Sequence, residues 1–406
     1  MSQRSIPAGE VDWSSVSHAY GPAVEIPGLL RSVRSDSQET RRGAYGDLAD
    51  LLVHQGSRYE ASAVVAPHLI DIVADPSAPD RFAACQVLAA IAVGDESSWL
   101  SDRSDPAEMR AEVRRRAPMS REQLEVRHRA WVAAAANEEE RSARERRAQW
   151  RDVEADRDEE RLTIEAYDAV RSGVPVYVAA LEAPEAAVRL YAAHLLAWFP
   201  EEEGLLGPAL ADLIRREPDP VVAATACVAA GLSCPDGGEA LIGALSTRRD
   251  SADRGERWSA VLGLSRMVRH PDRSLVRDLY SCLFGAVTPV PHWPFLDGDM
   301  ASMAALTIAD LSPDVAGDRV DVLAERAAAA DPSTDNVTLL TALLDAAFPE
   351  PVPDAAEFDD LTLVQRRTLA TLLGGNILRS GAMVAMLLRR YNLPDSERQL
   401  RTWCGG

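Results

Sequence analysis

A short pattern of small and branched apolar residues recurs along the chain, and it restricts the fold more than any other feature. Residues 187–197 place valine, alanine and leucine at helical spacing after a proline turn, and residues 221–232 repeat this texture after another. Aligning Val188 with Val222 gives a spacing of 34 residues, and residues 257–267 carry a looser third copy. A period of roughly 30–47 residues built from paired helices is typical of an α-solenoid. We therefore predict an all-α chain of stacked helix pairs.

Helical spacing and the proline or glycine residues at the junctions predict about eight such pairs. They cover residues 24–33 with 36–53, 61–74 with 79–93, 174–182 with 185–198, 204–216 with 219–232, 238–247 with 255–269, 272–287 with 299–311, 315–330 with 334–347, and 359–373 with 379–391. An irregular arm is expected over residues 1–21, and the end of the chain is expected to cap the last pair or to fray. Because a repeat array grows without splitting, 406 residues do not require separate globular domains.

A charged stretch interrupts the repeats after the second pair. From residue 95 to about residue 165 the chain is crowded with Arg, Glu and Asp, and neither glycine nor proline occurs between Pro118 and Gly173. Ser120 and Gln123 fit a capping box, and strong helix formers follow. We predict one very long helix, or a hairpin of two helices that turns near Asn137, inserted into the solenoid with its roots packed on the body.

These boundaries predict four segments. They are an N-terminal arm with two HEAT-like pairs over 1–94, a charged helical insertion over 95–170, central repeats over 171–348, and C-terminal helices with a cap over 349–406. The insertion holds a locally basic run of Arg141, Arg144, Arg146 and Arg147, which acidic residues on both sides nearly cancel. We favour a solvated helix here, and a docking surface for a partner helix is the alternative.

The texture of the second helices, with Val-Arg or Val-Val followed by alanines and leucine, resembles HEAT repeats. The start of the chain is similar to the opening of a group of bacterial HEAT-repeat proteins over its first quarter, through Trp13-x-x-Val-x-His18-Ala-Tyr-Gly21 and His54-Gln-Gly-x-x-Tyr59-Glu-Ala-Ser62. The HEAT resemblance implies right-handed stacking of helix pairs and protein binding on a concave face. It implies no particular activity.

Charge and composition narrow the function further. A net charge of −20 argues against nucleic acid and favours a protein partner with a basic surface. All 43 basic residues are arginine, which excludes a Schiff-base lysine and a P-loop lysine; codon usage and avoidance of lysine-directed modification both remain open as causes. No apolar run approaches the roughly 18 residues of a membrane span, and the N-terminus lacks a secretory signal, so we expect a cytoplasmic protein. The five cysteines form no Cys-x-x-Cys pair and are expected to be buried free thiols.

Two clusters are candidate binding sites. The first lies at the edges of the first helix pairs and holds His18, Tyr20, His54, Gln55, Tyr59 and Glu60. Two histidines and a glutamate are metal-ligand types, but none stand at the i, i+4 spacing of a zinc helix, so we predict no metal. A polar ligand site is one interpretation; the one we favour is that these side chains cap helix ends and seal the first repeat.

The second cluster is a long loop over residues 288–299 that gathers prolines and aromatic residues in a chain with only 5% aromatics. Its candidates are His292, Trp293, Phe295, Asp297 and Asp299. A rigid loop with aromatic residues suits recognition, and His292 with Asp297 would make an acid–base pair. The alternative, which we favour, is a connecting loop whose Trp293 and Phe295 fill a gap between repeats.

Enzymes built on HEAT scaffolds provide a further comparison. Deoxyhypusine hydroxylase-like proteins need His-Glu dipeptides as iron ligands, and this chain has none. HEAT-like DNA glycosylases need a basic concave face, and the net charge of −20 argues against one. A function like that of bilin lyase-like HEAT proteins remains an open alternative. The sequence therefore predicts a non-enzymatic protein-binding scaffold without a cofactor, with an inhibitor or immunity-type role as one form. The alternative is an enzyme or small-molecule-binding protein with its site in the His292–Asp299 loop or the His18/His54 cluster.

Overall fold

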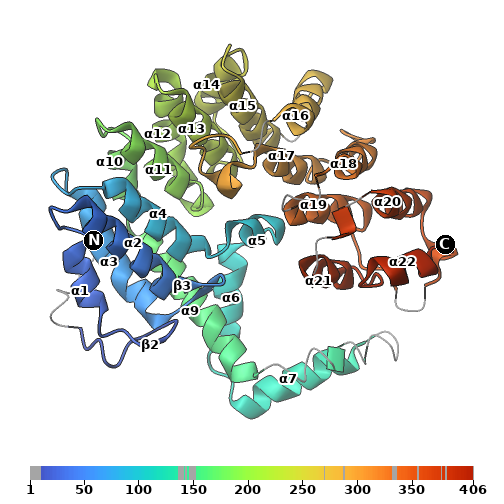
Figure 1. Cartoon of the computed structure of the whole chain (residues 1–406), viewed down its shortest axis with the longest axis horizontal. Helices are drawn as coiled ribbons and strands as arrows, with labels where there is room; N and C mark the ends of the chain where they lie inside the picture. The colour runs from blue at the N-terminus through green and yellow to red at the C-terminus, as the bar shows by residue number, and fades with distance from the viewer. Residues whose placement is uncertain are drawn as a thin grey trace. The chain divides into compact units, whose positions relative to one another are not determined.

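The computed structural model describes residues 11–135, 141, 144–145, 152–268, 270–286, 289–331, 336–353, 356–375, 377–379 and 382–405. Helices make up nearly all of its regular structure (Figure 1). The chain forms two compact units. Unit 1 comprises Met1–Leu124, Asp152–Met267 and His292–Phe295, and unit 2 comprises Glu125–Arg151, Val268–Pro291 and Leu296–Gly406. This division differs from the four predicted segments, which stay a prediction.

Unit 1 opens with two helix pairs and two short hairpins. In chain order these are β1 (Ser17–His18), β2 (Gly21–Pro22), α1 (Ile26–Ser32), α2 (Gln38–Leu52), β3 (Val53–His54), β4 (Ser57–Arg58), α3 (Glu60–Ala74) and α4 (Arg81–Val93). The first hairpin corrects the prediction of an irregular arm over residues 1–21, and the second was not predicted. Gln55 and Gly56 both have positive φ (51° and 82°), as a two-residue hairpin turn of type I′ requires, and Gln-Gly is not one of its common signals.

The charged insertion contains several helices. These are α5 (Glu96–Ser101), α6 (Pro106–Arg116), α7 (Arg121–Ala133) and α9 (Val153–Arg171). The predicted capping box is present, because Ser120 N–H donates to Gln123 Oε1 at 2.9 Å and Gln123 N–H donates to Ser120 Oγ at 3.3 Å. The predicted turn near Asn137 and the arginines at 146 and 147 lie outside the described residues. Helix α9 packs on α3, α4 and α6, so the returning part of the insertion covers the first repeats.

Three further pairs complete unit 1. They are α10 (Val174–Ala180) with α11 (Ala186–Leu196), α12 (Glu203–Arg216) with α13 (Pro220–Ser233), and α14 (Glu239–Arg249) with α15 (Arg254–Met267). Helix α11 packs on α4 and on α13, and α13 packs on α15. The second helices therefore stack in order, and α11 follows α4 directly although the insertion separates them in sequence. This nearest-neighbour stacking is that of an α-solenoid.

Unit 2 continues with helix pairs. They are α16 (Arg273–Gly285) with α17 (Met300–Ala309), α18 (Arg319–Ala328) with α19 (Val337–Ala347), and α20 (Leu363–Gly374) with α21 (Ala382–Arg390), followed by α22 (Glu397–Trp403). Helix α17 packs on α16 and α19, and α18 packs on α19 and α20. All eight predicted pairs are thus present as helices, and the prediction of an all-α solenoid is confirmed.

A recurring arginine connects the repeats of unit 1. Arg41, Arg189 and Arg257 each donate from Nη1 to the carbonyl oxygen six residues earlier, at 2.9, 2.8 and 2.9 Å. Arg41 Nε also reaches Asp80 at 2.6 Å, and Arg189 Nε reaches Glu217 at 2.7 Å. Each of these acids precedes the second helix of the next repeat. The arginine of Val188-Arg189 therefore has a physical role, since it ties a turn to the next repeat, and Arg41 has the same role although it follows Thr40.

All five cysteines are free thiols, and four of them are buried, whereas Cys404 is only half-buried. Burial raises the pKa of the Cys234 thiol to about 11 and that of Cys85 to about 12, so both stay protonated at neutral pH.

Among the described residues, no helix combines the length and the apolar character needed to cross a bilayer.

Candidate functional site

The two hairpins bring part of the first predicted cluster together. The Ala19 N–H donates to the Leu51 carbonyl at 3.1 Å, which holds the turn of the first hairpin against the end of α2. The Tyr20 hydroxyl then lies 3.1 Å from His54 Nδ1, and the two rings meet edge to face with centroids 5.3 Å apart. Tyr20 is nevertheless 66% exposed, so one face of its ring is available to a partner.

His18 stabilises the structure of this cluster through hydrogen bonds at both of its ring nitrogens. Its side chain is buried, Nδ1 accepts the Tyr20 N–H at 3.0 Å, and Nε2 lies 2.9 Å from Glu25 Oε1. Because Nδ1 is an acceptor, these contacts assign the neutral tautomer with the proton on Nε2, which donates to Glu25. His18 therefore fixes the first turn and leaves Glu25 hydrogen-bonded to a neutral ring.

Two further carboxylates surround the hairpins. Glu60 Oε2 accepts both the N–H and the Oγ–H of Ser17 at 3.0 Å, and Glu159 Oε1 on α9 accepts the Ser57 hydroxyl at 2.8 Å. Glu60 was among the predicted residues, whereas Glu25 and Glu159 were missed. Nothing in the charged run of α9 distinguishes Glu159 from its solvated neighbours, because its role depends on α9 folding back over the hairpins.

We call the exposed surface formed by Tyr20, Glu25, His54, Glu60 and Glu159 the hairpin site. Its three carboxylates accept hydrogen bonds from a histidine ring, serine hydroxyls and a backbone N–H. Within the described part of the chain, none of the three forms an ion pair with an arginine. Arg58 and Arg161 nevertheless lie near enough for the charges of Glu159 and Glu60 to act on their pKa values. The negative charge of the site is therefore offset only in part, and the exposed Tyr20 ring belongs to the same surface.

The pKa values of two neighbouring side chains, Tyr59 and Arg58, are shifted by burial and by the charge of Glu159. Burial, and then the charge of Glu159, raises the pKa of the Tyr59 phenol. Burial lowers the pKa of Arg58 to about 10, while Glu159 opposes this change. Arg58 lies under the second hairpin, where Nη1 donates to the Gly56 carbonyl. A Cβ on Gly94 would overlap that guanidinium, so the close approach requires glycine. Gln55, at the tip, is exposed and supplies the turn.

The residue types of the hairpin site do not assemble as metal ligands. In the ranges that the structure describes, no group of three or more His, Cys, Asp or Glu side chains is placed to hold a metal ion.

The second predicted cluster is largely built into the core. Phe295 is fully buried, and its ring packs on His194, Trp198 and Trp293 with centroids 4.7, 6.0 and 5.3 Å away. Trp293 is 3% exposed. These two aromatic side chains fill a gap in unit 1, as the favoured interpretation predicts, and they present little surface to a ligand.

The polar residues of that loop, His292, Asp297 and Asp299, do not belong to this buried aromatic cluster. Asp299 caps α17, accepting the Ser302 N–H at 2.9 Å and its hydroxyl at 2.5 Å. His292 and Asp297 are exposed and adopt positive φ (62° and 53°). The structure records no hydrogen bond for either side chain within its described ranges. An acid–base pair of these two residues stays a prediction.

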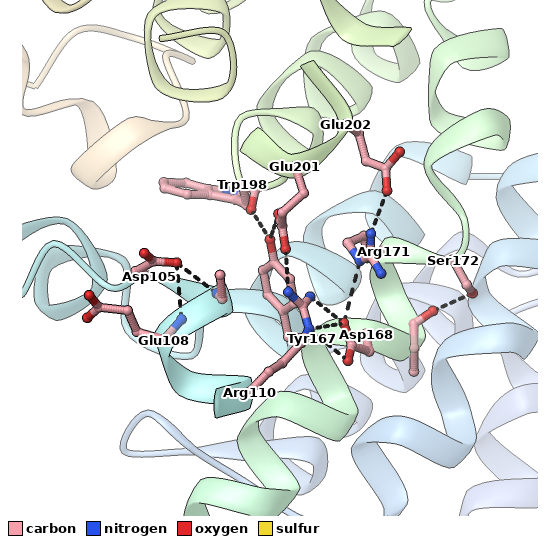
Figure 2. A network of polar contacts seen from close by, with 12 residues as sticks. Asp105, Glu108, Arg110, Tyr167, Asp168, Arg171, Ser172, Trp198, Glu201 and Glu202 are labelled. Carbon is pink, nitrogen blue, oxygen red and sulfur yellow. Dashed lines mark hydrogen bonds and ion pairs between the residues drawn. The ribbon is translucent and has the colours of Figure 1, made fainter. Parts of the chain in front are cut away.

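A third polar network, which the sequence did not reveal, joins the insertion to the repeats (Figure 2). Arg110 on α6 donates from Nε to Asp168 Oδ1 at 3.0 Å and from Nη1 to Glu201 Oε1 at 2.8 Å. The buried Tyr167 hydroxyl lies 2.7 Å from both the Trp198 carbonyl and Glu201 Oε2, and donates to one of them at a time. Burial, and then Glu201, raises the Tyr167 pKa, so the phenol stays protonated. The network fixes the root of the insertion.

Replacing Tyr167 by phenylalanine tests that role. The change leaves Glu201 and the Trp198 carbonyl without their buried donor, so we expect unit 1 to lose about 1–3 kcal/mol of stability. Urea denaturation monitored by circular dichroism measures the loss. Tyr20→Phe is the matched control at an exposed position and should change stability by less than about 0.5 kcal/mol. Equal midpoints of urea denaturation for the Tyr167→Phe variant and the parent would refute the anchoring role.

No family model matches the sequence, and no curated protein matches it. Among the solved structures that match is UNC-45 from Drosophila melanogaster, at 13% identity and a TM-score of 0.31, with 90% of this chain and 55% of that chain covered. The chain therefore spans about half the length of that protein.

Proposed function

We propose that this helical-repeat protein is a non-enzymatic binding module that captures a basic segment of a partner protein on the hairpin site. The observation that supports this most is that the exposed Tyr20 ring lies on the first hairpin, while the carboxylates of Glu25, Glu60 and Glu159 hydrogen-bond to residues of the two hairpins, all of them neutral groups. A surface that carries three carboxylates without a direct ion pair and an exposed aromatic ring suits a cation. Inhibition of a basic protein, including an immunity-type role, is one form of this function.

The geometry suggests how an arginine or lysine of the partner would bind. A guanidinium over the Tyr20 ring gains cation–π attraction, and its N–H groups can donate to the neighbouring carboxylates. His54 orients the ring through the 3.1 Å contact with the Tyr20 hydroxyl. The net charge of −20 would speed the approach of a basic partner and would disfavour nucleic acid. The proposal includes a cytoplasmic location for the protein.

Removing two charges from the hairpin site tests the proposal. We expect the Glu60→Gln/Glu159→Gln variant to bind a fluorescein-labelled arginine–glycine peptide at least about tenfold more weakly than the parent. Tyr20→Ala should weaken binding severalfold, whereas Tyr20→Phe should weaken it less, because the ring face remains and only the hydroxyl contact with His54 is lost. Fluorescence anisotropy at physiological salt measures all four proteins, and a glutamate–glycine peptide reports non-specific binding.

The matched control removes the same number of charges elsewhere in unit 1. Asp47 and Asp50 are exposed on α2 and lie outside the hairpin site. The Asp47→Asn/Asp50→Asn variant should bind the peptide within about twofold of the parent, since long-range charge effects are screened at this salt. Equal losses in the two double variants would mean that net charge, and not the hairpin site, attracts the peptide, and the proposal would be wrong.

An enzyme or small-molecule-binding protein with its site in the His292–Asp299 loop or the His18/His54 cluster is the second candidate. We rank it lower because both ring nitrogens of His18 are hydrogen-bonded and because Trp293 and Phe295 are buried.

A further inference from the structure

A groove of about 520 Å³ lies between α2 and α4, apart from the hairpin site. It is lined by Gln38, Arg42, Tyr45, Gly46, Ala49, Asp80, Phe82, Ala83, Gln86, Val87 and Ala90. Ligand pockets in proteins commonly measure roughly 300–1,000 Å³. The groove is therefore large enough for a small molecule, and both helices that form it belong to unit 1.

The floor of the groove is aromatic and apolar. Tyr45 is buried in it, and Phe82 is held in place by stacking on Tyr191, with ring centroids 6.0 Å apart and planes 29° from parallel. A Cβ built on Gly46 meets no atom within 4 Å. The groove is thus open above Gly46, and its flat rings are fixed before a ligand arrives.

Arg42 gives the groove a positive charge, because the other charged residue of its lining, Asp80, forms an ion pair with Arg41. The Asp80 carboxylate is bonded to Arg41 Nε at 2.6 Å, so it is already neutralised. Arg42 is exposed at the rim and forms no ion pair with any described residue. The Tyr45 hydroxyl is buried and has no hydrogen-bond partner within the described ranges. A ligand with one negative group would satisfy Arg42, and its apolar body would cover the rings.

We propose that this groove binds a small molecule with a flat apolar body and a single carboxylate or sulfonate. The body lies against Phe82, with the largely buried Tyr45 beneath it, and the anionic group accepts hydrogen bonds from the Arg42 guanidinium. An uncharged analogue of the same shape would fill the floor without this charge-assisted contact, so the groove should prefer the anion.

Two fluorescent probes of similar shape test this. We expect 1-anilinonaphthalene-8-sulfonate to bind the full-length protein at one site, and Gly46→Leu, which fills the groove, to weaken binding at least about tenfold. Gly43→Leu is the matched control, because Gly43 lies on the same helix, is equally open and does not line the groove. Arg42→Gln should weaken sulfonate binding about tenfold and leave binding of the neutral N-phenyl-1-naphthylamine unchanged.

Circular dichroism and the melting midpoint establish that each variant is folded before its affinity is compared. The proposal is wrong if the sulfonate does not bind the parent, if Gly46→Leu and Gly43→Leu bind it equally well, or if Arg42→Gln weakens both probes to the same degree. These outcomes are independent of arginine-peptide binding at the hairpin site.

Discussion

Replacing Gly263 by valine is expected to destabilise unit 1 by about 3 kcal/mol or more, a larger loss than most single substitutions cause. Helices α13 and α15 meet here backbone to backbone. A Cβ on Gly231 would lie 2.6 Å from Gly263 Cα, and a Cβ on Gly263 would overlap the Cys227 carbonyl oxygen. Because backbone atoms cannot rotate away as a side chain can, the two helices must separate to admit any side chain.

The same substitution at Gly243 is the matched control. Gly243 lies inside α14 in the same unit, is exposed, and has open space where its Cβ would be. Valine is a better helix former than glycine, so Gly243→Val should leave stability unchanged or raise it by a few tenths of a kcal/mol. Chemical denaturation of the two variants measures the difference. If Gly263→Val were as stable as Gly243→Val, the close contact between α13 and α15 would not exist.

Replacing Glu217 by alanine should cost about 3–5 kcal/mol, because it leaves a guanidinium in a largely buried place without its counter-charge. The Glu217 side chain is fully buried, and its two oxygens accept from Arg189 Nε at 2.7 Å and Nη2 at 2.8 Å. Arg189 lies in the first turn of α11, the second helix of one repeat, and Glu217 is the C-cap of α12, the first helix of the next. The pair therefore holds consecutive repeats together, and its loss should lower the midpoint of urea denaturation.

The pH dependence of this effect follows from the pKa of Glu217. Burial alone would raise that pKa, but the hydrogen bonds from Arg189 and from the Asp219 N–H outweigh burial and lower it below its ordinary value. A carboxyl with a depressed pKa in the folded state stabilises the fold above its unfolded pKa of about 4.3 and loses this contribution as pH falls through the folded pKa.

The difference in stability between the parent and Glu217→Ala should accordingly be largest near neutral pH and should shrink in acid. Arg34→Ala, which removes a solvent-exposed ion pair with Asp75, is the comparison, and it should cost less than about 1 kcal/mol. A loss for Glu217→Ala as small as that for Arg34→Ala would contradict the account of the buried pair.

The order of the helices could be predicted from the sequence because the apolar pattern records burial directly. Val188 and Val222, 34 residues apart in the sequence, fall on α11 and α13, which are successive second helices of the stack. Gly231 and Gly263 lie inside the recurring stretches, and small residues there let the helices approach closely. The contact between α4 and α11 could not be predicted from the pattern, because the insertion separates these helices in the sequence and only tertiary packing brings them together.

The candidate site could be predicted only in part. His18, Tyr20, His54 and Glu60 could be predicted because they are polar residues at the edges of the first helix pairs, and they do lie around the two hairpins. Glu159 could not have been found, because it is one acid among many on α9, and its place depends on how α9 packs on α3. Trp293 and Phe295 could be interpreted in two ways from the sequence, and their burial agrees with the favoured one, in which they fill a gap.

The central claim is that a basic partner binds at the hairpin site, and hydrogen–deuterium exchange measured by mass spectrometry tests where it binds. The full chain is compared with and without a saturating arginine–glycine peptide. We predict slower exchange in peptides that cover residues 17–25, 53–60 and 153–165, with no change over residues 289–299. Slower exchange confined to residues 289–299, or none at the two hairpins under saturation, would contradict the claim.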